Sequence, residues 1–207
     1  MHDYPQLAPL FPEKMIFVRL GGHFTKTVVS PEEKCRFLLA AHTAFAACAP
    51  RGRWDILPVA EVDGSGITLS DGTFIPGSRF ALQCSCITHL WFGSATVGNA
   101  VVKMRDEAKK ISDAAVYDAA ASETAEETME LLQKLAAQTL FPKGLCFATR
   151  RYSPGFGDMP LDNQQFFFSR LRLAELGMNL SENFFISPEK SVTAFAGITS
   201  RIDHEQK

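Results

Sequence analysis

The connector from Arg150 to Pro160, RRYSPGFGDMP, holds the densest group of residues that could do chemistry. Arginine can hold a carboxylate through two hydrogen bonds, and an aromatic ring can stack on a base or cover a cation. Proline fixes φ and glycine permits close backbone approach, so the connector is expected to be a shaped loop. Residue chemistry alone favours a plainer interpretation, a rigid turn with Arg150 and Arg151 in solvent and Phe156 in the core.

A second group of reactive residue types consists of Cys84, Cys86 and His89. On a strand, the two cysteines would share one face and His89 would point to the other. No second CxxC or HxxxH pattern supplies the remaining ligands of a closed zinc site, so buried free thiols are the favoured interpretation. Cys35 and His42 share one face of a predicted helix; core packing is favoured there, and a Cys/His nucleophilic pair stays open.

The composition is that of an ordinary globular protein, with 207 residues, 46% apolar, 21% charged and a formal net charge of −2. It excludes intrinsic disorder and gives no basic footprint for nucleic acid. No apolar run reaches the roughly 20 residues that cross a bilayer, and the first residues do not resemble a leader peptide. Five cysteines, an odd number, do not indicate a disulfide framework. We therefore expect a soluble, cytoplasmic protein with no nucleic-acid or membrane partner.

The first half of the chain is predicted to place one helix among several strands. Residues 1–12 are predicted to form an extended arm, and Lys14–Leu20 a buried strand. Ser30, Pro31 and Glu33 predict a helix start, as N-cap, first-turn proline and capping-box partner. The predicted helix has an apolar stripe of Leu38, Leu39, His42 and Phe45, and a β-meander follows over Trp54–Val62, Gly66–Leu69 and Thr73–Ile75.

The second half is predicted to place the connector between a strand and a helix. Apolar runs, caps and glycine stops define its elements. They are an inner strand over Ile87–Val97 broken at Gly93, a helix from Asn99 to about Lys110, a long helix from Ser112 to about Gln138, a strand over Leu145–Arg150, a helix from Pro160 to Gly177, and short strands over Phe184–Ile186 and Ser191–Ile198. These elements predict one α+β domain over residues 1–207, with residues 13–80 as a less well defined N-terminal lobe.

The connector and the residues after it resemble a known family. RYSPGFGDMPL, then Gln164-Gln165, GMNLSEN from Gly177 and PEKSVT from Pro188 resemble the activation domain of cobalamin-dependent methionine synthase, above all its free-standing members. The resemblance is specific over residues 145–198 and weaker, but in order, over residues 87–140. It implies an α+β fold in which a twisted antiparallel sheet has flanking helices, with residues 81–200 as the family-like core.

The resemblance also implies a ligand and a partner. In that family the domain binds S-adenosylmethionine and caps the cobalamin domain, where cob(II)alamin is reduced by an electron from a flavodoxin-like donor and remethylated. The matching ligand contacts here are Arg151, Ser153, Gly155 and Phe156, together with Glu126 on the long helix. Arg151 would hold the methionine carboxylate, and Glu126 would accept hydrogen bonds from the amine or ribose. Phe156 keeps the ring of the family's tyrosine without its hydroxyl.

Three hypotheses follow for the function. The first is an accessory reactivation subunit that docks on a corrinoid-carrying methyltransferase and presents S-adenosylmethionine to its cobalt, with no catalytic acid, base or nucleophile of its own. The second is a corrinoid-protein-binding module of the same fold without S-adenosylmethionine binding, which the missing hydroxyl at Phe156 favours. The third is an unrelated enzyme that uses the cysteine and histidine group. For Glu126 by itself, a solvated carboxylate beside Glu123, Glu127 and Glu130 is the plainer interpretation.

Overall fold

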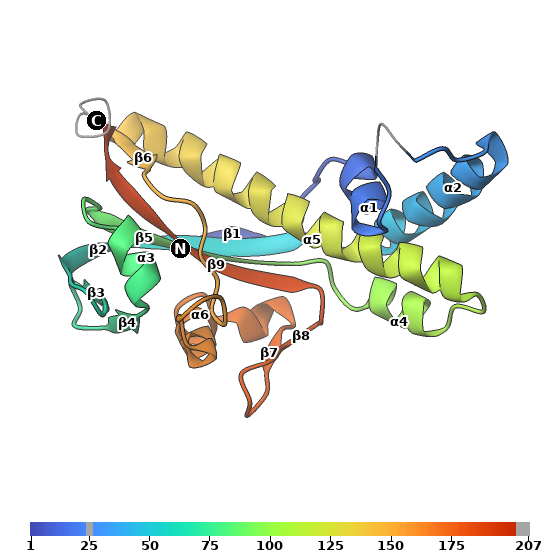
Figure 1. Ribbon diagram of the computed structural model, residues 1–207. Helices are drawn as coiled ribbons and strands as arrows, with labels where there is room; N and C mark the ends of the chain where they lie inside the picture. The colour runs from blue at the N-terminus through green and yellow to red at the C-terminus, as the bar shows by residue number, and fades with distance from the viewer. Residues whose placement is uncertain (24–26, 202–207) are drawn as a thin grey trace.

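The computed structural model describes residues 1–23 and 27–201, and shows an elongated molecule with a sheet at one end and a helical lobe at the other (Figure 1). One helix, α5 (Ile111–Leu140), joins the two ends. Its 30 residues span about 45 Å, at a rise of about 1.5 Å per residue. Helix α5 therefore contributes to the hydrophobic core on one face of the sheet and to that of the helical lobe.

Seven strands form an open antiparallel sheet in the order β4-β3-β2-β5-β9-β6, with β1 paired to β2. The central strand is continuous through Gly93, which was predicted to break it. A Cβ at Gly93 would lie 2.4 Å from the ring of Trp91, so the missing side chain leaves room for the indole. The strands are β1 (His2–Tyr4), β2 (Arg51–Val62), β3 (Gly66–Leu69), β4 (Phe74–Pro76), β5 (His89–Thr96), β6 (Leu145–Phe147) and β9 (Ser191–Ser200), and a separate hairpin pairs β7 (Asn179–Leu180) with β8 (Ile186–Ser187).

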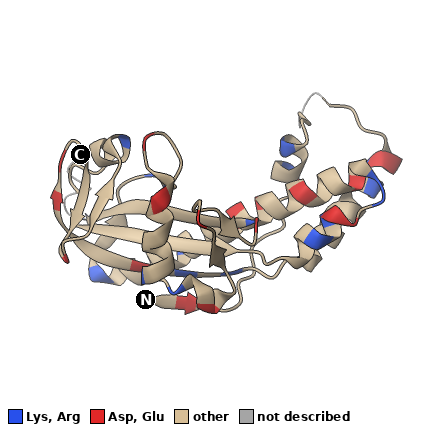
Figure 2. Ribbon diagram, turned by 90° about the horizontal axis from the view of Figure 1, so that it is seen from below, with Lys and Arg blue, Asp and Glu red and all other residues tan. Residues whose placement is uncertain are grey.

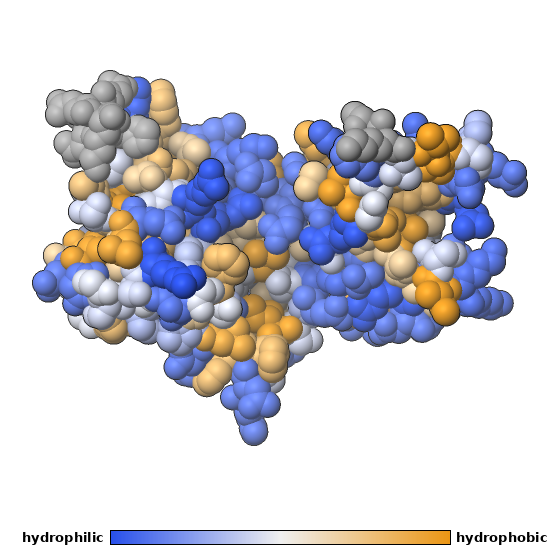
Figure 3. Space-filling view, viewed as in Figure 1, coloured by the Kyte–Doolittle hydropathy of each residue, from blue (hydrophilic) through white to orange (hydrophobic). Residues whose placement is uncertain are grey.

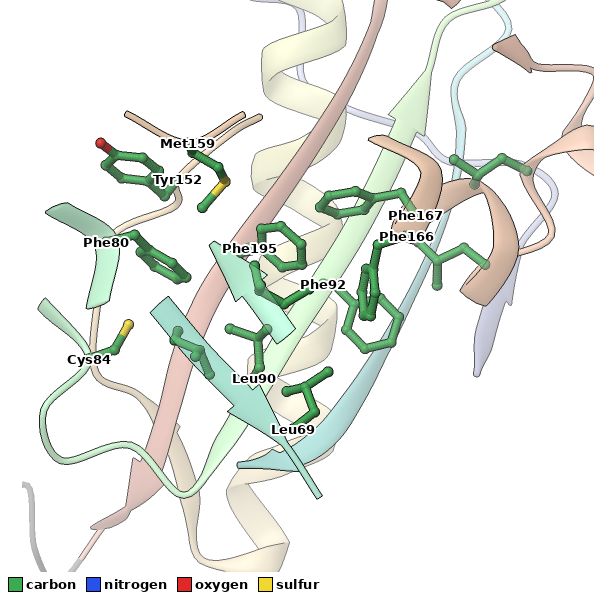
Figure 4. Close-up of a cluster of buried hydrophobic side chains, with 14 of the residues drawn as sticks. Leu69, Phe80, Cys84, Leu90, Phe92, Tyr152, Met159, Phe166, Phe167 and Phe195 are labelled. Atoms are coloured by element: carbon green, nitrogen blue, oxygen red, sulfur yellow. The ribbon is translucent and has the colours of Figure 1, made fainter. Parts of the chain in front are cut away.

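The central strands are buried on both faces. Helix α5 covers one face, where Trp54 and Trp91 pack against Met129. On the other face, Phe92 and Phe195 pack against Phe167 and the remaining side chains of Figure 4. That second layer consists of α3 (Ser78–Gln83), α6 (Gln164–Arg170), the short 3-10 helices η2 (Leu161–Asn163) and η3 (Leu173–Leu176), and the connector; a third such helix, η1 (Phe141–Lys143), follows α5.

The helical lobe packs through small side chains. Helices α1 (Glu13–Arg19), α2 (Pro31–Ala47) and α4 (Ala100–Asp106) surround the first half of α5 around an alanine-rich core. Acidic and basic residues are interspersed on both ends of the molecule (Figure 2). Among the described residues, no helix is long and apolar enough to cross a membrane.

Much of the predicted architecture is confirmed. The α+β class with an antiparallel sheet and flanking helices is present, and β2, β3 and β4 form the predicted meander. The start of α2 is a complete capping box: the Ser30 hydroxyl accepts from the Glu33 amide, and the Glu33 carboxylate accepts from the Ser30 amide. Residues 2–4 of the predicted arm join the sheet as β1.

The strand predicted over Lys14–Leu20 is wrong, because this segment forms helix α1. A short apolar run fits a buried strand and a helix equally well by periodicity. Here Ile16 is buried against the lobe, and Glu13 and Arg19 have the signs that favour the two ends of a helix.

The stripe predicted for α2 is wrong at Leu39 and His42, whereas Leu38 and Phe45 are half-buried. Leu39 is 69% exposed, and His42 is an exposed residue that stacks on Phe11 with ring centroids 3.9 Å apart. The buried residues are Ala41 and Ala44, since small side chains let α2 approach α5 closely.

The helix predicted from Pro160 to Gly177 is interrupted. It consists of η2, α6 and η3, and Arg172 between the last two has a φ of +48°. At this interruption the buried guanidinium of Arg53 donates to the carbonyl oxygens of Leu171 and Arg172, and the Arg172 carbonyl also accepts from the Glu175 amide at the start of η3. Gly177 ends η3, as expected.

Other predicted boundaries shift. Helix α4 ends at Asp106 rather than near Lys110, and Asn99 makes no side-chain capping bond. The strand predicted over Leu145–Arg150 stops at Phe147, although Tyr152 pairs again with Phe195 of β9. Phe184 has a φ of +62° and lies before β8 rather than within a strand.

Candidate functional site

Arg151 and Glu126 lie beside each other between the connector and α5. The backbone of Tyr152 exchanges two hydrogen bonds of 2.9 Å with Phe195, which holds the connector in extended conformation against β9. The Tyr152 side chain enters the core, so Arg151 points to the opposite side, toward α5. Its Nη2 lies 3.8 Å from Glu126 Oε2.

Two other side chains of α5 hold the same guanidinium. Arg151 Nη1 donates to Glu130 Oε2 at 2.9 Å and to Gln133 Oε1 at 2.9 Å. Glu126, Glu130 and Gln133 are spaced so that they form one row on the helix surface. The sequence predicts Glu130 to be a solvated carboxylate and gives no signal for Gln133, because no local pattern indicates which side chains of a long helix face a distant arginine.

Glu123 is the carboxylate of α5 whose environment differs from the prediction. It was grouped with the solvated acids, and it is buried. Its Oε1 accepts a hydrogen bond from Arg19 Nε of α1. Glu123 therefore ties the helical lobe together, whereas the Glu126 side chain is about half exposed beside Arg151.

The connector closes on itself between Ser153 and Met159. The Gly155 amide donates to the Met159 carbonyl, the Phe156 amide to the Ser153 carbonyl, and the Met159 amide to the Phe156 carbonyl. Gly155 and Gly157 have φ values of +83° and +62°, a region that strongly favours glycine. The predicted shaped loop is thus confirmed, with Ser153 half-buried and Gly155 exposed.

Asp158 fastens this loop to α3. Its carboxylate accepts from the Ser78 hydroxyl and from the Arg79 amide at the start of the helix. The Ser78 hydrogen bond holds the pKa of Asp158 below its usual value. Neither α3 nor this contact was predicted, because Asp158 and Ser78 are distant in sequence and carry no shared signal.

The rigid-turn interpretation predicted Phe156 in the core, and this is wrong, because Phe156 lies on the surface. It is 68% exposed, and its ring meets that of buried Tyr152 edge to face at 5.4 Å. Tyr152 in turn stacks on Phe80 of α3. Within the described part of the chain, Ser153, Gly155 and Phe156 make no hydrogen bond to Arg151 or Glu126.

The cysteine and histidine group is dispersed. Cys84 caps α3 instead of lying on a strand, and its burial raises the pKa of the thiol to about 12. Cys86 is exposed, and burial lowers the pKa of His89 at the start of β5. Over residues 1–23 and 27–201, no group of three histidine, cysteine, aspartate or glutamate side chains could hold a metal ion. Cys35 is exposed, so the Cys35 and His42 pair does not lie in a core.

A hollow of about 600 Å³ lies elsewhere, between α1 and α2. Its lining includes Phe17, Leu20, Val28 and Phe37, and none of its residues belongs to the connector or α5. Apolar residues also reach the surface over this lobe and near α6, β7 and β8 (Figure 3). Its lining includes Gly22 and Thr27, which flank the undescribed residues 24–26 in the sequence, and we assign no site to it.

No protein-family model and no curated protein matches this sequence. Solved structures do match its fold. Among them is the crystal structure of the MetH reactivation domain bound to AdoHcy, with a TM-score of 0.62 and 16% sequence identity over 90% of this chain and 72% of that chain. The chain therefore has an activation-domain-like fold, as the resemblance of the connector had implied.

Proposed function

We propose that this protein is an accessory reactivation subunit for a cobalamin-dependent methyltransferase of the methionine synthase type. It would bind S-adenosylmethionine through Glu126, Arg151, Ser153, Gly155 and Phe156, while a separate corrinoid protein carries the cobalamin. The observation that carries this proposal is the meeting of Arg151 and Glu126 beside a shaped loop, in a chain with this fold.

The residues present fit the amino-acid end of S-adenosylmethionine. A guanidinium suits its carboxylate, and the half-exposed Glu126 carboxylate suits its ammonium group. The exposed ring of Phe156 offers an apolar surface on the same loop. S-adenosylmethionine would supply the methyl group, and a flavodoxin-like protein the electron, for remethylating the partner's cobalt.

The part played by this chain would be binding and orientation. Holding the methyl donor against the partner's corrinoid lowers the entropic cost of the encounter and requires no proton transfer. The raised pKa of the buried Cys84 thiol disfavours Cys84 as the nucleophile of a thiol enzyme, because the thiolate is the reactive form. If alkylating the cysteines and replacing His89 abolished an activity of the protein, that alternative would return.

The first experiment is a calorimetric titration of the protein with S-adenosylmethionine and with S-adenosylhomocysteine. We expect saturable binding of both, and at least about tenfold weaker binding in Arg151→Met, because a charged hydrogen-bonded anchor is lost. Arg150→Met is the matched control, since Arg150 is exposed and should leave affinity unchanged. Absence of heat at millimolar ligand would contradict donor binding.

A corrinoid-binding module without a methyl donor is the second candidate. Two observations favour it: the ring at Phe156 has no hydroxyl, and the Arg151 guanidinium already pairs with Glu130. Capture of a purified corrinoid methyltransferase together with silence in the titration would select this candidate. The Phe156 ring is exposed. If Phe156→Ser no longer captured the corrinoid methyltransferase, the connector would be part of the binding surface.

A further inference from the structure

We infer that Glu130 and Gln133 are positioning residues for Arg151, which fix its guanidinium so that one edge is presented to the carboxylate of an amino-acid-bearing ligand. This inference rests on the proposed function and extends it to two residues that carry no motif. A guanidinium on a long side chain has many rotamers, and a ligand that must order it loses affinity. Two fixed acceptors remove that cost.

The hydrogen bonds of the Arg151 guanidinium show which of its edges is available to a ligand. Nη1 carries two N–H groups, and the two acceptors at 2.9 Å, Glu130 Oε2 and Gln133 Oε1, account for both. Nε and Nη2 form the adjacent edge, whose parallel N–H groups match a carboxylate. Glu126 lies 3.8 Å from Nη2, beyond hydrogen-bond distance, and so leaves this edge able to bind.

Arg151, Glu130 and Gln133 together form what we call the Arg151 clamp. The two elements that carry these residues are firmly packed. Helix α5 is anchored below the row by Met129, Leu132 and Ala136, all buried against the sheet. The connector is anchored by the Tyr152 pairing with β9. Arg151 is thus held between two elements that are each packed on the same sheet.

The charges of the clamp are also suited to a ligand. Gln133 is neutral, so it holds the guanidinium without offsetting its charge. Glu130 offsets part of that charge, and Lys134 Nζ lies 3.7 Å from its other carboxylate oxygen. With Glu126 included, two acids and two cations meet here, an arrangement that accepts a zwitterion more readily than a bare anion.

The test compares two nucleosides in the intact protein. S-adenosylhomocysteine carries the amino-acid end, and 5′-methylthioadenosine lacks it. We expect Gln133→Leu to weaken the binding of S-adenosylhomocysteine by about tenfold. The affinity for 5′-methylthioadenosine should change by less than about twofold, because only the first ligand uses Arg151. Gln133→Glu keeps the acceptor but adds a negative charge beside the ligand carboxylate, so it should also weaken binding of S-adenosylhomocysteine and leave 5′-methylthioadenosine unchanged. Gln138→Leu, an exposed position of the same helix, is the control. An equal loss for both ligands would overturn the inference.

A second readout needs no ligand. Nitrogen relaxation of the Arg151 Nε–H group should report a rigid side chain in the wild type and a mobile one in Gln133→Leu. A rigid, clamp-dependent Arg151 in a protein that binds neither nucleoside would refute the proposed function and leave the clamp standing. Equal mobility in both proteins would refute the clamp, even if S-adenosylhomocysteine bound to the wild type.

Discussion

Two arginines show how burial and hydrogen bonding separate a structural from a ligand-binding role. Arg53 is buried; its Nε and Nη2 donate to Asp3, and its Nη1 donates to Glu175 and to two backbone carbonyls. It ties the N-terminal strand to the η3 region and holds the pKa of Asp3 below its usual value. Among the described residues, Arg151 makes its hydrogen bonds through Nη1 alone. The open edge, rather than the charge, distinguishes the candidate site.

The connector should be intolerant of a side chain at Gly157. We expect Gly157→Ala to destabilise the protein by about 2–4 kcal/mol, because the residue has positive φ and the added Cβ would meet the Tyr152 hydroxyl. Gly144→Ala is the control: it shares the positive φ and has no neighbour within 4 Å, so it should cost only about 1–2 kcal/mol. Chemical denaturation measures both free energies of unfolding, and equal losses would show that packing at Tyr152 is loose.

At the scale of elements, the site lies where three pieces meet. Strand β9 holds the connector by backbone pairing, α5 holds the Arg151 side chain, and α3 holds the loop tip through Asp158. Each contact joins segments far apart in the sequence. The shape of the loop therefore depends on the packing of α3 as much as on its own glycines and prolines.

The contact between Asp158 and α3 should depend on pH. The folded-state pKa of Asp158 is lowered, so its stabilising contribution is present above the unfolded value of 3.8 and is lost as pH falls through the lowered value. Hydrogen exchange of residues 153–159, corrected for the intrinsic effect of pH, should therefore show full protection at neutral pH and loss of protection below about pH 4.

Asp158→Asn should remove that pH dependence. It should also raise exchange in the loop at neutral pH, while leaving the central strand β5 protected. Asp162→Asn is the matched control, since Asp162 has no hydrogen bond to α3 in the described structure. Unchanged protection of the loop in Asp158→Asn would mean that its own turns suffice to hold it.

At the scale of the whole molecule, the two ends share one helix. The second half of α5 packs on the sheet through Met129 and Leu132, and the first half packs in the lobe through Ala120 and Ala121. The predicted N-terminal lobe over residues 13–80 does not correspond to one body: α1 and α2 belong to the helical lobe, and β2 to β4 to the sheet. A single domain over residues 1–207 stays a prediction, and residues 202–207 lie outside the described structure.

We expect the chain to unfold in one cooperative transition. Both tryptophans, Trp54 and Trp91, are buried between the sheet and α5, so their fluorescence reports the sheet end. Far-UV circular dichroism reports mainly the helices of the lobe and α5. The two signals should coincide in denaturant, because loss of α5 disrupts both the lobe core and the sheet core that contains the tryptophans. A helical transition at lower denaturant than the fluorescence change would show that the lobe melts independently.

The sequence by itself determined the features that are encoded within a few residues. Ser30, Pro31 and Glu33 specify the start of α2, and the turn residues of the meander specify its strands, because each interaction closes within one turn. The same holds for the shaped connector, whose prolines fix their own φ and whose glycines permit the positive φ values that its turns need. The family resemblance added Arg151 and Glu126 as candidate ligand contacts, and the two side chains lie close together.

Only the tertiary structure decided what depends on distant contacts. Residues 13–19 are a helix rather than a strand because Ile16 enters the lobe, and Pro160–Gly177 is broken at Arg172, where Arg53 from the distant strand β2 donates to two backbone carbonyls. The hydrogen bonds from Arg151 to Gln133 and from Ser78 to Asp158 also depend on contacts between distant segments. A hydrogen bond between side chains far apart in sequence leaves no periodic pattern, so packing alone brings its two partners together.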